Sequence, residues 1–195
     1  GLISTYRMSD TVMGVMANVF YIDMGFSKDQ IASISKLFGL FMTLFGAGAG
    51  GLLIVRFGIM PILFFGGIAS AATNLLFAML SGMGADVQML IVTICFDNFS
   101  SGLATTAFVA YLSSLTNLKF SATQYALLSS FYALLGKFLK GFSGVVVDSL
   151  QQGHELMVAY AMFFAGTAAV GIPAVLLCWL LDRRNRRLKA AIGAG

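Results

Sequence analysis

Six charged residues lie inside long apolar runs of this sequence, where ionised side chains are rare. They are Arg7, Asp10, Lys36, Asp97, Lys137 and Lys140. An ionised side chain near the centre of a bilayer costs at least about 2.5–3.5 kcal/mol and therefore faces protein or water rather than lipid. If the apolar runs cross a membrane, these residues mark a polar path or a binding site.

Cations outnumber acids among these residues, which favours an anionic substrate. A lysine ammonium binds carboxylate or phosphate groups, so Lys137 and Lys140 are the first candidates for substrate binding. Lys36, Asn98 and Ser101 complete the predicted binding set. Lys36 lies nearer the end of its run, and the alternative is that its side chain extends to the membrane surface.

The acids allow a second kind of chemistry, because a carboxyl group inside a membrane can carry a coupling proton. Asp97 is the candidate for proton coupling, and Arg7 with Asp10 is predicted to form a gating ion pair. Asp97 and Lys137 would lie at similar depths, about 14 and 15 Å from the outer end at 1.5 Å per residue. The alternative is that both pairs are static and only fix helix packing.

Helical spacing places polar residues on common faces. In the first run, one face carries Arg7, Asp10, Gly14, Asn18 and Tyr21. In the fourth run, Asp97, Ser101 and Thr105 follow one another at intervals of four residues. The third and sixth runs contain no charge, so we expect the other four helices to line a polar cavity and these two to face lipid.

The composition supports a membrane location for these charges. Of the 195 residues, 58% are apolar and only 10% are charged, against about 45–50% and about 25% in soluble domains. Since a bilayer core of about 30 Å requires roughly 20 apolar residues per helix, the sequence predicts an all-α membrane protein with six transmembrane helices. Their expected ranges are 5–24, 30–54, 60–82, 88–115, 123–147 and 156–181.

A repeated pattern relates the two halves of this set. Phe26-Ser27-x-x-Gln30 recurs as Phe120-Ser121-x-x-Gln124, and each copy contains a Ser-x-x-Gln capping box that begins a helix. Because three helices lie within one period, the second copy enters the membrane from the opposite side. Unless the match is a coincidence of apolar sequence, we expect an inverted 3+3 repeat.

Basic residues in short loops predict the orientation, because they stay on the cytoplasmic side of a membrane. Arg56, Lys119 and the basic cluster at 183–189 fall on one side, whereas Asp148 and Glu155 fall on the other. Both ends are therefore predicted to be cytoplasmic, with a six-helix domain at 1–182 and a basic cytoplasmic tail at 183–195.

Several kinds of chemistry are not expected. The sequence contains no Gly-x-x-x-x-Gly-Lys-Ser/Thr loop for ATP, and its one histidine, His154, falls in an outer loop. Cys95 and Cys178 lie within apolar runs and are predicted to be packed thiols. We therefore expect no enzyme activity, no metal, no organic cofactor and no nucleic-acid partner. Glycines such as Gly46 and Gly144 are predicted to allow close helix packing.

Several stretches resemble the C-terminal half of the AmpG-type muropeptide permeases of the major facilitator superfamily. Phe96-Asp97-Asn98, Thr106-Ala107-Phe108-Val109-Ala110 and the stretch at 120–129 are similar to that family's fourth and fifth helices in this half. Arg7-x-x-Asp10 is similar to its basic-x-x-Asp element. The loop at 51–58 resembles the superfamily's Gly-x-x-x-Asp-Arg-x-Gly motif, but Val55 replaces the aspartate, which puts the charge relay of that motif in doubt.

The resemblance implies half of a 12-to-14-helix permease of the bacterial inner membrane that imports anhydro-muropeptides, with protons as the coupling ion. The bilayer, the anionic substrate and an N-terminal half of the same transporter would be its partners. Two alternatives stay open. One is a porter for another bulky anion such as an acyl-coenzyme A, and the other is a scaffold or receptor domain that transports nothing.

Overall fold

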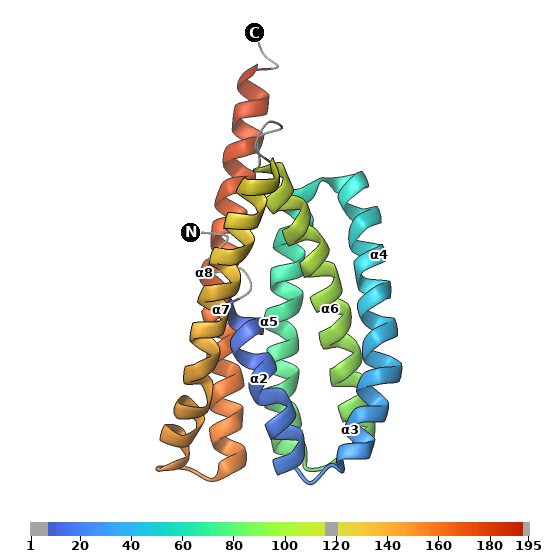
Figure 1. The fold of residues 1–195 in the computed structure, drawn as a ribbon, viewed down its shortest axis with the longest axis vertical. Coiled ribbons are helices and arrows are strands. Elements are labelled where there is room, and N and C mark those ends of the chain that lie inside the picture. The colour runs from blue at the N-terminus through green and yellow to red at the C-terminus, as the bar shows by residue number, and fades with distance from the viewer. Residues whose placement is uncertain (1–7, 116–120, 193–195) are drawn as a thin grey trace.

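The computed structural model describes residues 8–115 and 121–192, and every element in these ranges is helical. Arg7 lies outside them. The elements are α2 (Met8–Asp23), α3 (Lys28–Ile34), the π-helical segment η1 (Ser35–Gly39), α4 (Leu40–Phe57), α5 (Ile59–Met83), α6 (Val87–Ser114), α7 (Ser121–Gln151) and α8 (Leu156–Ile192). The long helices run alongside one another as a bundle, with the end of α8 projecting beyond it (Figure 1).

Local sequence signals explain where several helices begin. Ser27 caps α3, since its hydroxyl accepts from the Gln30 amide at 3.2 Å and its own amide donates to the Gln30 side chain at 3.1 Å. This confirms the first predicted capping box. The carboxylate of Asp86 caps α6 by accepting from the amide of Gln88 at 2.8 Å.

The α4–α5 turn depends on Gly58, whose φ is +88°. Side chains other than glycine are strained in this left-handed region. Gly58 also donates its amide to the carbonyl oxygen of Ile54 at 2.8 Å, which closes the end of α4. The chain therefore reverses within one residue between two long helices.

The second predicted helix differs from a continuous α-helix. It is built from α3, the π-helical segment η1 and α4 in succession. A π-helical turn inserts an extra residue and changes which side chains face the neighbouring helix. Lys36 lies in this segment, and Gly39 at its end is buried against Asn98 of α6.

Four helical stretches are long and apolar enough to cross a membrane: Lys28–Phe57, Ile59–Met83, Val87–Ser114 and Leu156–Leu180. The apolar part of α2, Val12–Asp23, is shorter. The chain is therefore a multi-pass, all-α membrane protein. Six membrane crossings and the inverted 3+3 repeat stay predictions.

Helix α5 lies between the other helices, where it packs against α8 and α6 (Figure 1). Helix α4 packs on α6, and α2 packs on α7 and α8. The core near α2 is aromatic, with the Phe20 ring centroid 5.1 Å from that of Tyr160 and 4.9 Å from that of Phe164. Phe77 of α5 joins this cluster, 5.2 Å from Phe164.

Candidate functional site

Asp97 lies half-buried on α6. The hydroxyl of Thr73 on α5 donates to its carboxylate, with an oxygen–oxygen distance of 3.4 Å. The buried Tyr21 of α2 lies within electrostatic range of the same carboxylate. A carboxyl group within the predicted span of α6 therefore interacts with residues of both α5 and α2.

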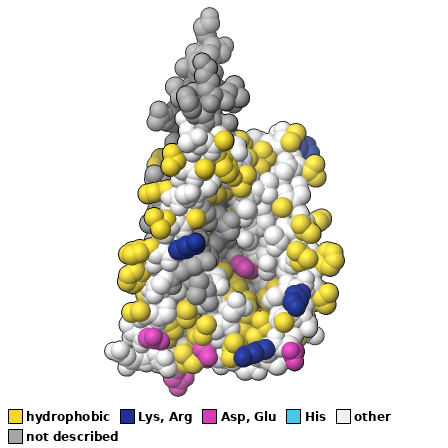
Figure 2. Space-filling view, in the orientation of Figure 1, with side chains coloured by type: hydrophobic (Ala, Val, Ile, Leu, Met, Phe, Trp, Pro, Cys, Tyr) yellow, Lys and Arg dark blue, Asp and Glu magenta, His cyan; other side chains and the backbone are white. Residues whose placement is uncertain are grey.

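The face shown in Figure 2 is hollowed in its middle, and an acidic side chain lies in the hollow. Among the acids whose side chains the structure describes, all except Asp97 are at or beside helix ends: Asp23, Asp29, Asp86, Asp148 and Glu155. Lys or Arg side chains flank the hollow over α7 and over the region of α3 and α4 (Figure 2). These are the elements around Lys137 and Lys36, and both side chains are exposed.

Asn98 and Ser101 lie on α6 close to Asp97, but Asn98 contributes to helix packing. Its side-chain oxygen accepts from the Thr43 hydroxyl of α4 at 3.1 Å, and its amide nitrogen donates to the carbonyl oxygen of Ile94 at 2.8 Å. The half-buried Ser101 accepts through its carbonyl oxygen from the Thr105 hydroxyl at 2.5 Å. A substrate role for either side chain stays a prediction.

Lys36 lines a groove of about 460 Å³ between α2 on one side and α3 with the start of η1 on the other. Asn18, Lys28 and Ser35 also line it. Two lysines near the end of the bundle are compatible with an anion at this groove and with the alternative that Lys36 reaches the membrane surface. Asn18 and Tyr21 are expected on one polar face of α2. In the structure Asn18 is exposed, whereas Tyr21 is only 5% exposed.

Three of the predicted residues lie wholly or partly outside the described part of the chain. Asp10 and Lys140 belong to α2 and α7, but their side chains are outside the described part of the chain, as is the whole of Arg7. The gating pair of Arg7 with Asp10, and the role of Lys140, therefore stay predictions.

Helix α5 contributes polar groups that the charge-based reasoning missed. Ser70, Thr73 and Asn74 are all buried, and Thr73 contacts Asp97. The expectation that the third helix only faces lipid is therefore incomplete. The spacing of Ser70, Thr73, Asn74 and Phe77 on one helical face could have indicated a buried stripe, but hydroxyls and amides carry no charge that would mark them in an apolar run.

Asn74 provides a stability test of this stripe. Its side chain is 0% exposed, and neither its amide nitrogen nor its oxygen has a hydrogen-bond partner among the described residues. An unpaired buried polar group costs about 1–3 kcal/mol, so Asn74→Leu is expected to raise the thermal unfolding temperature of the purified protein. Asn98→Leu is the matched control and should lower it, because that amide is hydrogen-bonded. Equal destabilisation by both substitutions would contradict the assignment.

The fold and the polar residues around Asp97 together define a class of protein. It is a helical membrane protein with a carboxyl group and hydroxyl groups inside its apolar helices. No protein-family model matches the sequence.

The chain is homologous to part of the AmpG transporters. It is 34% identical over 179 residues to "Putative transporter AmpG 4" of Rickettsia felis, which covers 92% of this chain and 41% of that protein. It is 34% identical over 145 residues to "Putative transporter AmpG 3" of Rickettsia prowazekii, covering 74% and 34%. "Putative transporter AmpG 1" of the same organism is 30% identical over 172 residues, covering 88% and 37%. The chain thus spans about two fifths of the length of the first of these relatives. All three relatives are named as transporters and not as enzymes.

Proposed function

We propose that this chain forms half of a secondary active transporter that imports anhydro-muropeptides across the bacterial inner membrane together with protons. The observation that carries the proposal is Asp97, a half-buried carboxyl group within a predicted span that accepts a hydrogen bond from Thr73. A carboxylic acid in this position can take up and release a proton. The homology to proteins named AmpG transporters supports transport as the activity.

In this proposal the lysines recognise the substrate. Muropeptides carry several carboxylates, which a lysine ammonium binds as a point charge. Lys137 and Lys140 on α7 are the proposed primary contacts, and Lys36 with Asn98 and Ser101 are secondary ones. Arg7 and Asp10 are the proposed gating pair.

The pattern of helix contacts supports the inverted repeat that such a transporter half requires. In the predicted repeat, α2 corresponds to α6, α4 to α7 and α5 to α8. The α4–α6 contact of the structure then corresponds to the α7–α2 contact. In the same way, the α5–α6 contact corresponds to the α8–α2 contact, and the α5–α8 contact corresponds to itself. A pseudo-two-fold axis in the membrane plane has this effect. The proposed second half of the path comes from an N-terminal set of helices.

Orientation follows the loop charges. Arg56 at the end of α4 and Arg183 near the end of α8 lie on the side proposed to be cytoplasmic, whereas Asp29, Asp86 and Asp148 lie near the other ends of the helices. This arrangement fits the rule that basic residues stay inside. The tail at 183–195 is then cytoplasmic.

Uptake with competition tests the substrate class. Vesicles containing the complete protein would be given labelled anhydro-muropeptide with excess unlabelled muropeptide or excess acyl-coenzyme A, and in a parallel experiment labelled acyl-coenzyme A. We expect uptake that only the muropeptide suppresses. Uptake of labelled acyl-coenzyme A without uptake of labelled muropeptide would favour the other porter, and no uptake of either labelled compound would favour a scaffold.

A further inference from the structure

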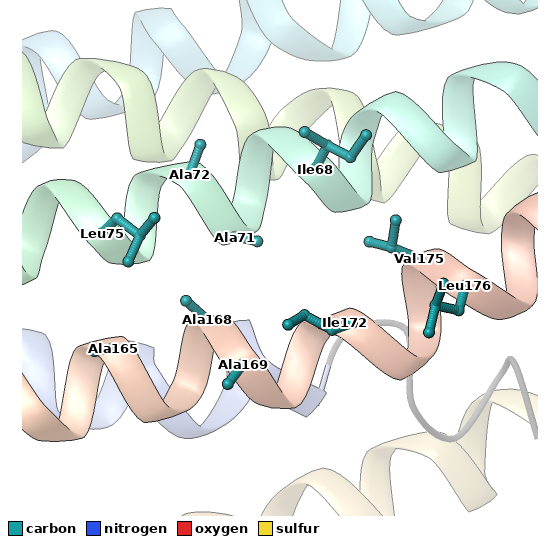
Figure 3. Close-up of a pocket in the computed structure, with 10 residues that line it drawn as sticks. All are labelled: Ile68, Ala71, Ala72, Leu75, Ala165, Ala168, Ala169, Ile172, Val175 and Leu176. Carbon is teal, nitrogen blue, oxygen red and sulfur yellow. The ribbon is translucent and has the colours of Figure 1, made fainter.

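An apolar groove of about 490 Å³ lies between α5 and α8 (Figure 3). Its lining is entirely aliphatic: Ile68, Ala71, Ala72, Leu75, Ala165, Ala168, Ala169, Ile172, Val175 and Leu176. The alanines keep the groove open, because longer side chains would fill it. Leu75 is 50% exposed and Ile172 is 54% exposed, so the groove opens on the surface of the bundle.

The groove matches the dimensions of one membrane leaflet. Both of its walls belong to stretches long and apolar enough to cross a membrane. On α8 it extends from Ala165 to Leu176, about 17 Å at 1.5 Å per residue. This is roughly half of a hydrocarbon core of about 30 Å. An acyl chain lying along the groove would therefore stay within a single leaflet.

One end of the groove leads to a cation. Ala165, Ala169, Ile172 and Leu176 follow one another at intervals of three or four residues, and continuing this spacing along α8 reaches Trp179 and Arg183. The Arg183 guanidinium carbon lies 4.3 Å from the centroid of the Trp179 ring. Arg183 also lies three residues beyond the apolar stretch that ends at Leu180. A tryptophan and an arginine in this place suit the headgroup level of a membrane.

We propose that the groove binds one acyl chain of an anionic phospholipid, whose phosphate contacts Arg183. The aliphatic walls account for the chain, and the guanidinium accounts for the negative headgroup. A phosphate accepts charge-assisted hydrogen bonds from a guanidinium, whereas an apolar helix from a second copy would leave this cation without a complementary charge. The site is separate from the proposed transport path and does not depend on the substrate.

Native mass spectrometry of the complete protein tests the headgroup part of this site. The protein would be purified in detergent with equal amounts of phosphatidylglycerol and phosphatidylcholine of identical acyl chains. We expect the wild type to retain phosphatidylglycerol preferentially, and Arg183→Gln to reduce that preference about fivefold, the effect of one cation near an anionic membrane surface. Arg56→Gln is the matched control, since Arg56 also lies over an aromatic ring, Phe57, but at the end of α4.

A second pair of variants tests the groove itself. Ala169→Phe should reduce retention of both lipids by filling the groove, whereas Val170→Phe should not, because Val170 is exposed on another face of the same helix. Equal retention of the two lipids by the wild type would overturn the proposal. Unchanged retention in Arg183→Gln or Ala169→Phe would do so too. A disulfide that joins two copies of Ala169→Cys in native membranes would also overturn it.

Discussion

Gly102→Ala is expected to separate α4 from α6 and to prevent much of the protein from folding. A Cβ atom at Gly102 would overlap the backbone oxygen of Thr43. It would also lie only 3.0 Å from the backbone nitrogen of Ala47. Backbone atoms cannot rotate away as side chains do, so the helices themselves must move. Overpacking costs about 1–3 kcal/mol and occasionally more. The movement would also break the bond between Thr43 and Asn98, 3.1 Å long.

The measurement is the yield of monodisperse protein and its thermal unfolding temperature in detergent. Gly46→Ala should behave like Gly102→Ala, because its Cβ would collide with the backbone of Phe99. Gly48→Ala on the same helix is the control. Nothing lies within 4 Å of a Cβ there, and alanine is favoured over glycine in helices by about 1 kcal/mol. If all three variants were equally stable, the close approach of α4 and α6 would be wrong.

Asp97→Asn is expected to abolish accumulation of labelled anhydro-muropeptide driven by an imposed pH gradient. Asparagine has nearly the same shape and still accepts a hydrogen bond from Thr73, but it cannot carry a proton. Uptake should therefore fall to that of empty vesicles, while exchange of labelled for unlabelled substrate in the absence of a gradient should continue. The continued exchange would separate loss of coupling from loss of folding.

The control for this variant is Asp29→Asn, which removes an exposed carboxylate in the first turn of α3. It should leave gradient-driven accumulation unchanged. Full accumulation by Asp97→Asn would show that Asp97 carries no coupling proton and would support the alternative of a static ion pair. A loss of both accumulation and exchange would call for the unfolding measurement on that variant.

The helices were predictable from sequence because apolar length and end signals act locally. Ser27 with Gln30 indicates the start of α3, and Gly58 indicates the α4–α5 turn, without knowledge of the fold. The π-helical segment at 35–39 was not predictable in this way. This segment lies where Gly39 and Thr43 contact Asn98. These contacts join residues more than 50 positions apart, so local sequence does not indicate them.

The candidate site was predictable only in part. A lone charge in an apolar run, such as Asp97, is conspicuous because its insertion is costly. Thr73 and Asn74 are not conspicuous, since hydroxyls and amides occur in transmembrane helices at small cost, and their burial depends on how α5 packs. The Gly46 prediction was confirmed by its contact with Phe99, whereas at Gly144 no described atom lies within 4 Å of a Cβ.

The most direct test of the proposed function is uptake of labelled anhydro-muropeptide into vesicles that contain the complete protein, with a pH gradient imposed and then removed by a protonophore. We expect accumulation above the external concentration, collapse of that accumulation on adding the protonophore, and no accumulation in vesicles lacking the protein. Absence of uptake under all conditions would contradict the proposal that this chain is half of a muropeptide importer.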